Sequence, residues 1–208
     1  MPVEVDMGTP SERREFGLKR GKVFPAERAG SLMNPLRRLV QSPGRAVAAM
    51  GLAENSKVLE VGSGPGFFSP FIANAAPRGR VILVDVQFEM LAAARQRLAT
   101  AANVSYAQAD ACALPIRTGQ FDAVFLATML GEVPDRDLCI KEVRRILRPG
   151  GLVTIVETRR DSDFISLTSL GDLLDRHGFS FVDRRGVAWQ YAARFQAGDA
   201  RLRTDRAR

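Results

Sequence analysis

The chain has 208 residues, 46% hydrophobic and 25% charged, which is enough for one domain with a sizeable core. The formal net charge is +7, and basic residues gather near both ends of the chain. No apolar run approaches the ~20 residues of a membrane-spanning helix, and the first residues lack the pattern of a signal peptide. We therefore expect a cytoplasmic protein without a membrane span.

Cysteine and histidine usage favours neither a metal site nor a disulfide framework. Cys112 and Cys139 lie far apart in the sequence, no CxxC occurs, and His177 is the only histidine. We expect two packed thiols and no metal centre.

The basic clusters near the two ends have several possible uses. A solvated basic face is the commonest explanation, although such clusters also bind nucleic acid, anionic lipid or an acidic substrate. The N-terminal cluster comprises Arg13, Arg14, Lys19, Arg20, Lys22, Arg28, Arg37, Arg38 and Arg45, and the tail carries Arg201, Arg203, Arg206 and Arg208.

Residues 1–55 are predicted to form an N-terminal helical or lid segment. We favour a lid, or a helix packed on the edge of a sheet. A helix lying on a membrane surface is the alternative, but Pro35 and Pro43 interrupt the segment. Its apolar positions are Leu32, Met33, Leu36, Leu39 and Val40, interleaved with Arg37 and Arg38.

From residue 56 to 196 the pattern alternates between strands and helices. The strand-like runs at 57–62, 80–85, 103–108, 121–128 and 151–157 are apolar at consecutive positions, as in a parallel sheet covered on both faces. Helical stretches are predicted at 67–76, 88–101 and 135–147. This order predicts a doubly wound α/β fold.

The rhythm changes after Glu157. A helix is predicted from Ser166 to His177, stopped by Gly178, and two strands follow at 179–186 and 187–196. Their connection is too short for a crossover helix, so the last strand is expected to be antiparallel to its neighbour. The basic tail, 197–208, is expected to be disordered.

The stretch "VLEVGSGPGFF" places a glycine-rich turn directly after the first strand of this domain. Glycine lets the backbone approach a ligand closely at the carboxyl end of a strand. Gly62, Gly64 and Gly66 form GxGxG, whereas the dinucleotide fingerprint would require glycine or alanine where Phe67 stands.

The region from about Ser56 to Phe195 resembles the class I S-adenosylmethionine-dependent methyltransferases. "LEVGSGPG", "LVDVQ", "AQADACALP", "FDAVFLATML" and "EVRRILRPGGLVTIVE" match five of that family's motifs in the right order. The resemblance implies a seven-stranded, mostly parallel Rossmann-like sheet with an antiparallel last strand. It also implies S-adenosylmethionine as the methyl donor.

The resemblance further implies which residues contact this cofactor. Glu60 and the backbone at Gly62, Ser63 and Gly64 would hold the methionine part, with Gly66 allowing close packing. Asp85 would accept from the ribose hydroxyls, and Asp110 with the Ala111 amide would bind adenine; the alternative for each aspartate is a helix cap. Val86 and Gln87 would flank the adenine or ribose, and Ala127 and Thr128 would border the sulfonium.

No catalytic residue is assigned from the sequence, because displacement of an activated methyl group requires mainly positioning and exclusion of water. A general base is needed only if the acceptor carries a proton to be removed. The candidates near strand ends are Glu132, Glu157, His177 and Tyr191.

The plain single-domain layout is most similar to methyltransferases of small molecules, including the quinone and lipid methylating group. With 7% aromatic residues and no added RNA-binding module, the sequence does not favour a nucleic-acid partner. Two alternatives stay open: a non-catalytic regulator that binds RNA or protein, and a nicotinamide oxidoreductase. The acceptor atom and the oligomeric state are also open.

Overall fold

The computed structural model describes Pro25, Met33 and residues 42–159, 161, 163–187 and 189–198. Apart from Pro25 and Met33, the predicted N-terminal segment up to residue 41 lies outside the described residues. So does the tail from residue 199 onward. Expectations for both regions therefore remain predictions.

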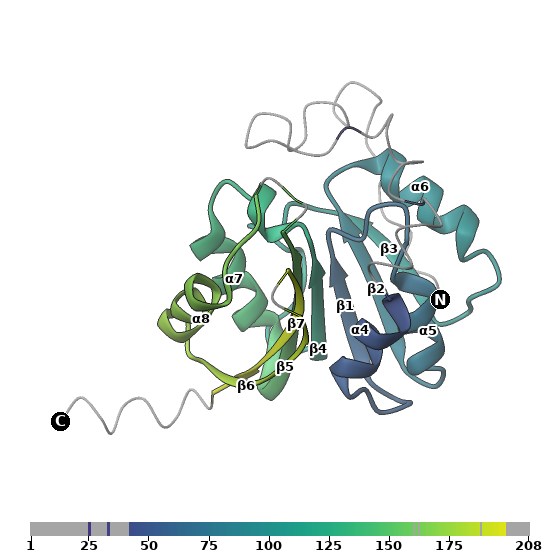
Figure 1. Ribbon diagram of the computed structural model, residues 1–208. Coiled ribbons are helices and arrows are strands. Elements are labelled where there is room, and N and C mark those ends of the chain that lie inside the picture. Colours follow the sequence, from purple (N-terminus) through teal and green to yellow (C-terminus); the bar gives the residue numbers. More distant parts are fainter. Residues whose placement is uncertain are drawn as a thin grey trace.

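A seven-stranded sheet with the order β3-β2-β1-β4-β5-β7-β6 forms the centre of the fold (Figure 1). Neighbouring strands from β3 to β5 pair in parallel, whereas β7 is antiparallel to both β5 and β6. The predicted fold class and its antiparallel last strand are confirmed. The strands are β1 (Lys57–Val61), β2 (Arg80–Asp85), β3 (Val104–Gln108), β4 (Phe121–Ala127), β5 (Leu147–Thr158), β6 (Phe179–Val187) and β7 (Gln190–Ala197).

Helices cover both faces of the sheet, giving three layers (Figure 1). One face packs against α7 and α8, with Val143 and Leu174 among the fully buried side chains. The other packs against α4, α5 and α6, with Met50 and Ile72 in its core. The helices are α4 (Pro43–Met50), α5 (Ser69–Ala75), α6 (Phe88–Arg97), α7 (Arg136–Ile146) and α8 (Leu167–Arg176), and a short 3-10 helix, η2, spans Leu130–Glu132.

Side-chain caps define where two of the helices begin. The Asp135 carboxylate accepts from the Leu138 amide at 2.8 Å, and Ser166 Oγ accepts from the Ser169 amide at 3.1 Å. Both residues hold amides that the first helical turn leaves unpaired.

Some predicted boundaries were wrong. The first helix after the glycine turn begins at Ser69 rather than at residue 67, because Phe67 and Phe68 are buried in the core before the helix starts. The helix predicted at 88–101 ends at Arg97. Strand β5 begins at Leu147, and its pairing with β4 shifts where the Pro149–Gly151 turn is accommodated.

The first helix that the structure describes, α4, packs on the same sheet as the rest of the domain. Val47 and Met50 are buried in the core that also contains the α5 side chains, and Met33 packs against that core. Gly51 ends α4 at φ +66°, a left-handed conformation that suits glycine.

No helix in the described part of the chain is long and apolar enough to cross a membrane.

Candidate functional site

The chain leaves β1 through a turn in which three glycines adopt positive φ: +67° at Gly62, +53° at Gly64 and +79° at Gly66. The Gly62 and Ser63 amides both donate to the Val84 carbonyl of β2, at 2.8 and 3.1 Å. Ser63 Oγ is buried and has no hydrogen-bond partner among the described residues. Because an unpaired buried polar atom costs about 1–3 kcal/mol, this hydroxyl marks a place suited to a polar ligand.

Met129, which follows β4, packs closely over this turn. A Cβ at Gly62 would lie only 2.8 Å from Met129 Cγ. The glycine therefore provides both the left-handed backbone and the space for the neighbouring strand end.

Asp85 is the last residue of β2 and connects the glycine turn to the start of α6. Its Oδ2 accepts from the Gly64 amide at 2.8 Å, and its Oδ1 accepts from the Gln87 amide at 2.9 Å. Burial raises the pKa of this carboxyl, and the amide hydrogen bonds oppose the rise. The capping position of α6 is Gln87, so the alternative of Asp85 as a helix cap is wrong.

Val86 and Gln87 lie half-buried between β2 and α6. The Gln108 side chain, at the end of β3, donates to the Val86 carbonyl at 2.9 Å. The two residues therefore lie beside Asp85 at the edge where these strands end.

Glu60 is a buried β1 residue whose carboxylate accepts from the Ser69 hydroxyl at 2.6 Å. Burial raises the pKa of Glu60 to about 8, the Ser69 hydrogen bond opposes the rise, and the Asp85 charge adds to it. Glu60 thus ties the strand to the start of α5, a contact that the sequence reading did not identify.

Asp110 and Ala111 lie just beyond the end of β3, both half-buried. Asp110 Oδ1 accepts from the Cys112 amide at 2.8 Å in a local turn, and no helix begins there, so the helix-cap alternative is wrong here too. The Ala109 amide donates to the Asp85 carbonyl at 3.1 Å, which joins this loop to β2.

Two side chains of α7 hold the same loop from below. Glu142 accepts from the Leu114 amide at 2.9 Å, and Arg145 donates to the Ile116 and Leu114 carbonyls at 2.6 and 3.0 Å. Glu142 and Arg145 also pair with each other at 2.7 Å. We call this pair the α7 clamp; no local sequence pattern distinguishes it from an ordinary helical ion pair.

Ala127 and Thr128 end β4 beside β1 and β5. The Thr128 amide donates to the Val156 carbonyl at 2.8 Å. Thr128 has φ +50°, which is unusual for a β-branched residue and costs on the order of 1–3 kcal/mol. Such strain is found mostly where surrounding structure imposes a functional geometry.

The four candidate bases have different surroundings. His177 pairs with Asp137 of α7 at 2.8 Å, and the Tyr191 hydroxyl donates to the Ile165 carbonyl at 2.7 Å. Glu132 is half-buried in η2.

Glu157, at the carboxyl end of β5, is 2% exposed, and its Oε1 has no hydrogen-bond partner among the described residues. Burial raises the pKa of Glu157 to about 8; the Ile165 amide and Arg136 oppose the rise, and Asp161 adds to it. Of the four candidates, Glu157 is the buried carboxyl that is left with an unused oxygen.

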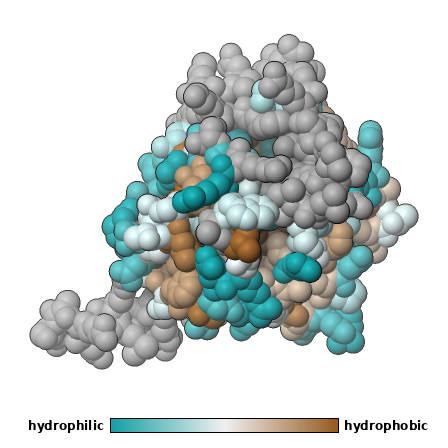
Figure 2. Space-filling model, in the orientation of Figure 1, coloured by the Kyte–Doolittle hydropathy of each residue, from teal (hydrophilic) through white to brown (hydrophobic). Residues whose placement is uncertain are grey.

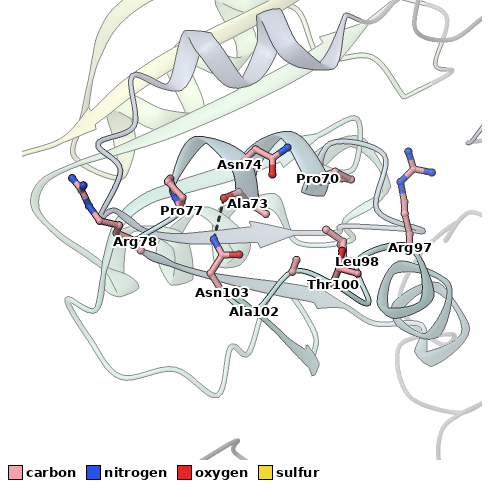
Figure 3. Close-up of a pocket in the computed structure, with 12 residues that line it drawn as sticks. Pro70, Ala73, Asn74, Pro77, Arg78, Arg97, Leu98, Thr100, Ala102 and Asn103 are labelled. Carbon is pink, nitrogen blue, oxygen red and sulfur yellow. Dashed lines mark hydrogen bonds between the residues drawn. The ribbon is translucent and has the colours of Figure 1, made fainter.

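An open groove lies at the opposite end of the sheet, where the parallel strands begin, away from these residues (Figure 3). Gly79 and Asn103, which line it, precede β2 and β3, whereas Asp85 and Asp110 follow them. The Asn103 side chain donates to the Ala73 carbonyl at 3.0 Å. The groove is therefore separated from the glycine turn by the length of the strands.

Within the described ranges, no cluster of three or more His, Cys, Asp or Glu side chains could hold a metal ion.

A protein-family model described as a methyltransferase domain matches residues 58–151, from β1 to the start of β5. Among curated proteins, the ubiquinone/menaquinone biosynthesis C-methyltransferase UbiE of Cellvibrio japonicus is 35% identical over 115 residues. That match covers 53% of this chain and 46% of the relative, so the chain spans about half the length of the curated relatives it matches.

Solved structures share the fold at low sequence identity. A S-adenosylmethionine-dependent methyltransferase from Aquifex aeolicus has a TM-score of 0.78 at 22% identity, covering 84% of this chain and 99% of its own. The [4+2]-cyclase SpnF has a TM-score of 0.67 at 19% identity, covering 74% of this chain and 79% of its own. Because the glycine turn, the acidic end of β2, the sheet order and the matching domain agree, residues 58–151 form a domain of the class I S-adenosylmethionine-dependent methyltransferase family.

Proposed function

We propose that this chain transfers a methyl group from S-adenosylmethionine to a small-molecule acceptor. The observation that carries the proposal is the Asp85 carboxylate, buried at the end of β2 and linked to the Gly64 amide of the glycine turn. S-adenosylmethionine supplies a methyl group that its positively charged sulfur already activates for displacement. The residues of this chain have to bind the cofactor and the acceptor, orient them for displacement and exclude water from the site.

Asp85 is proposed to bind the ribose. The carboxylate accepts from the Gly64 and Gln87 amides and also bonds the Val86 amide, and of its roughly four acceptor directions this leaves one for a ribose hydroxyl. These amides fix the carboxylate before the ligand arrives, so little side-chain entropy is lost on binding.

The glycine turn is proposed to hold the methionine part. Gly62, Gly64 and Gly66 bring the backbone close, and the unpaired Ser63 hydroxyl supplies a polar contact. Glu60 stabilises the turn through Ser69 and lies directly beneath the methionine position in this proposal.

The adenine is proposed to lie against the β3 loop. Asp110 accepts from its amino group, and the Ala111 amide donates to a ring nitrogen. Val86 and Gln87 flank the adenosine, while Ala127 and Thr128 border the reacting methyl group.

The acceptor is proposed to bind beyond the ends of β4 and β5. Thr128 pairs with Val156, and Glu157 follows directly, so its carboxyl belongs to the strand end that adjoins the reacting edge. With a pKa of about 8, Glu157 holds its proton at neutral pH and is able to donate a hydrogen bond to an acceptor oxygen. We assign it an orienting role towards a hydroxyl or carbonyl group of the acceptor.

A hydrophobic phenol or quinol is the acceptor class that we favour. Support comes from the relative in Cellvibrio japonicus, a ubiquinone/menaquinone biosynthesis C-methyltransferase, and from the short connections of the described domain. The match covers about half of that relative, so its own substrate is a guide to screening rather than an assignment.

The test is a methyl-transfer assay with methyl-labelled S-adenosylmethionine and a panel of phenols, hydroquinones and lipids. We expect transfer by the wild-type chain and loss in Gly64→Ala, because the proposed cofactor position requires a close approach to the backbone of this turn. Gly119→Ala is the matched control: Gly119 has a similar φ of +70°, and a Cβ there meets nothing within 4 Å.

Equal transfer by Gly64→Ala and Gly119→Ala would contradict the proposed site. Binding of S-adenosylhomocysteine without transfer to any panel member would instead favour the non-catalytic regulator.

A further inference from the structure

The β6–β7 hairpin carries two of the exposed large apolar residues of the described chain at its turn. Val187 is 48% exposed and Trp189 is 46% exposed. We call Val187 and Trp189 the hairpin tip. Single exposed apolar residues are ordinary on protein surfaces, so only their position and their neighbours can indicate a function.

The hairpin tip lies at the edge of the sheet that carries the proposed cofactor and acceptor sites. Gln190 pairs with Thr158 at the end of β5, and the Arg159 amide donates to the Trp189 carbonyl at 2.8 Å. Because β5 runs parallel to β1 and β4, the hairpin tip and the glycine turn both lie where these parallel strands end.

The described residues that flank the hairpin tip make close contacts. Gly186 adopts φ +104°, and a Cβ there would lie 2.5 Å from the Gln190 carbonyl oxygen. Tyr191, 2% exposed, anchors the return strand through its hydrogen bond to Ile165.

Basic side chains accompany the apolar tip. Arg184 and Arg185 are exposed on β6, the edge strand, and neither forms an ion pair with a described residue. Adjacent strand positions place them on opposite faces of the sheet. Arg159, also exposed, lies next to Trp189 and has its guanidinium 5.7 Å from the centre of the Phe164 ring.

Tryptophan with flanking arginine is a combination that suits the boundary between lipid and water. An indole has an apolar body and one polar N–H, and arginines bind phosphate headgroups. The net charge of +7 adds a long-range attraction to a negatively charged surface.

In Figure 2, apolar and polar residues adjoin one another over α8, β6 and β7, rather than forming one broad apolar area. A mixed surface of this kind fits shallow contact with a headgroup layer better than a protein interface with a continuous apolar centre.

From these observations we propose that the hairpin tip docks the reacting edge of the molecule on an anionic lipid bilayer. Trp189 and Val187 enter the interfacial layer, and Arg184, Arg185 and Arg159 bind its phosphates. Docking brings the acceptor side within reach of hydrophobic molecules held in the bilayer. The docking itself is independent of methyl transfer.

Trp189 is the only tryptophan of the chain, so its fluorescence reports on the hairpin tip directly. The experiment titrates the full chain with phosphatidylglycerol/phosphatidylcholine vesicles and with pure phosphatidylcholine vesicles. We expect a blue shift of the emission, and quenching by brominated acyl chains, with the anionic vesicles only. Rising salt should weaken both signals.

Two matched pairs of variants, followed by vesicle sedimentation, test the site. Arg184→Gln/Arg185→Gln should weaken binding roughly 30-fold, at ~1 kcal/mol per basic residue near the surface. Arg78→Gln/Arg80→Gln removes the same charge from the opposite edge and should bind like the wild type.

Trp189→Ser should weaken binding roughly tenfold. Phe181→Ser, which changes a 55% exposed aromatic elsewhere on β6, should not.

Three results would overturn the proposal: vesicle binding with unchanged Trp189 emission, equal losses in a variant and its control, or a blue shift that depends on protein concentration without vesicles. The last would mean that a second copy covers the tip. Because no methyl donor is present, failure here leaves the proposed methyl transfer standing, and failure of cofactor binding leaves this result standing.

Discussion

Asp85 is the residue on which the cofactor site depends most directly. It is buried, and its two oxygens accept from the backbone amides of Gly64 and Gln87. The same residue therefore shapes the glycine turn and offers the contact that is proposed for the ribose.

Asp85→Asn is expected to weaken S-adenosylhomocysteine binding by roughly 10- to 100-fold. The amide loses one acceptor oxygen and the charge, and hydrogen bonds to a charged group contribute about 1.5–3 kcal/mol. Titration calorimetry measures the dissociation constant.

Asp122→Asn is the control for this change, because Asp122 also accepts from a backbone amide, that of Lys57 at 2.7 Å, but at the other end of β1. Equal affinity of the two variants for S-adenosylhomocysteine would show that Asp85 does not contact the cofactor.

Glu157 gives the second prediction at this scale, which concerns pH. Its pKa is raised from 4.5 to about 8 by burial, with Asp161 adding to the shift and the Ile165 amide and Arg136 opposing it. Burial, and to a smaller extent the charge of Glu157 on the paired strand, raises the pKa of Tyr191. Between the two pKa values of Glu157 the folded state keeps a proton that the unfolded state has released. The contribution of Glu157 to stability is thus fully present below pH 4.5 and is lost as the pH rises through 8.

Glu157→Gln cannot ionise, so it should unfold less readily than the wild type at pH 9, by on the order of a few kcal/mol. Denaturant unfolding at pH 5, 7 and 9 measures the slope of the free energy of unfolding against pH. Part of the slope should remain, because burial raises the pKa of Glu60 in the same direction. An unchanged slope in Glu157→Gln would show that this carboxyl is ionised in the folded protein.

At the scale of elements, α7 supports the adenine loop. The clamp residues Glu142 and Arg145 hold the loop at Leu114 and Ile116, a few residues after Asp110 and Ala111. A helix on one face of the sheet is in this way coupled to the position of a loop at its edge.

Arg145→Gln should lower the free energy of unfolding by about 1–3 kcal/mol, because the Ile116 carbonyl loses its side-chain donor and Glu142 loses its ion-pair partner. It should also weaken S-adenosylhomocysteine binding several-fold. Arg148→Gln breaks an exposed pair with Asp122 and should change stability by no more than ~1 kcal/mol. Thermal unfolding with and without ligand measures both effects, and a stability loss without an affinity loss would limit the clamp to a structural role.

The succession of strands and helices along the chain and the antiparallel direction of the last strand could be predicted from the sequence, because consecutive apolar positions and short connections are local signals. The start of α5 was misplaced by two residues, since whether Phe67 and Phe68 are helical is decided by the core that receives them. The Glu60–Ser69 bond, the packing of Met129 on Gly62 and the α7 clamp join distant residues, and no local pattern predicts them.

At the scale of the whole molecule, the two ends of the strands differ in character. The carboxyl ends bring together the glycine turn, Asp85, Asp110 and Thr128, together with the hairpin tip. The opposite edge carries the open groove lined by Gly79 and Asn103. The likeness to a [4+2]-cyclase shows that this architecture also serves other chemistry, so the ligand rather than the fold has to decide the function.

The most direct test of the central claim is a thermal shift with S-adenosylmethionine, S-adenosylhomocysteine and NADH, measured side by side on the full chain. A ligand at about 100 times its dissociation constant adds roughly 2.7 kcal/mol, and each kcal/mol moves Tm of a domain of this size by about 2–4 °C. We predict a shift of several degrees with both sulfur cofactors and none with NADH. A shift with NADH alone, or with none of the three, would contradict the assignment of the Asp85 crevice to S-adenosylmethionine.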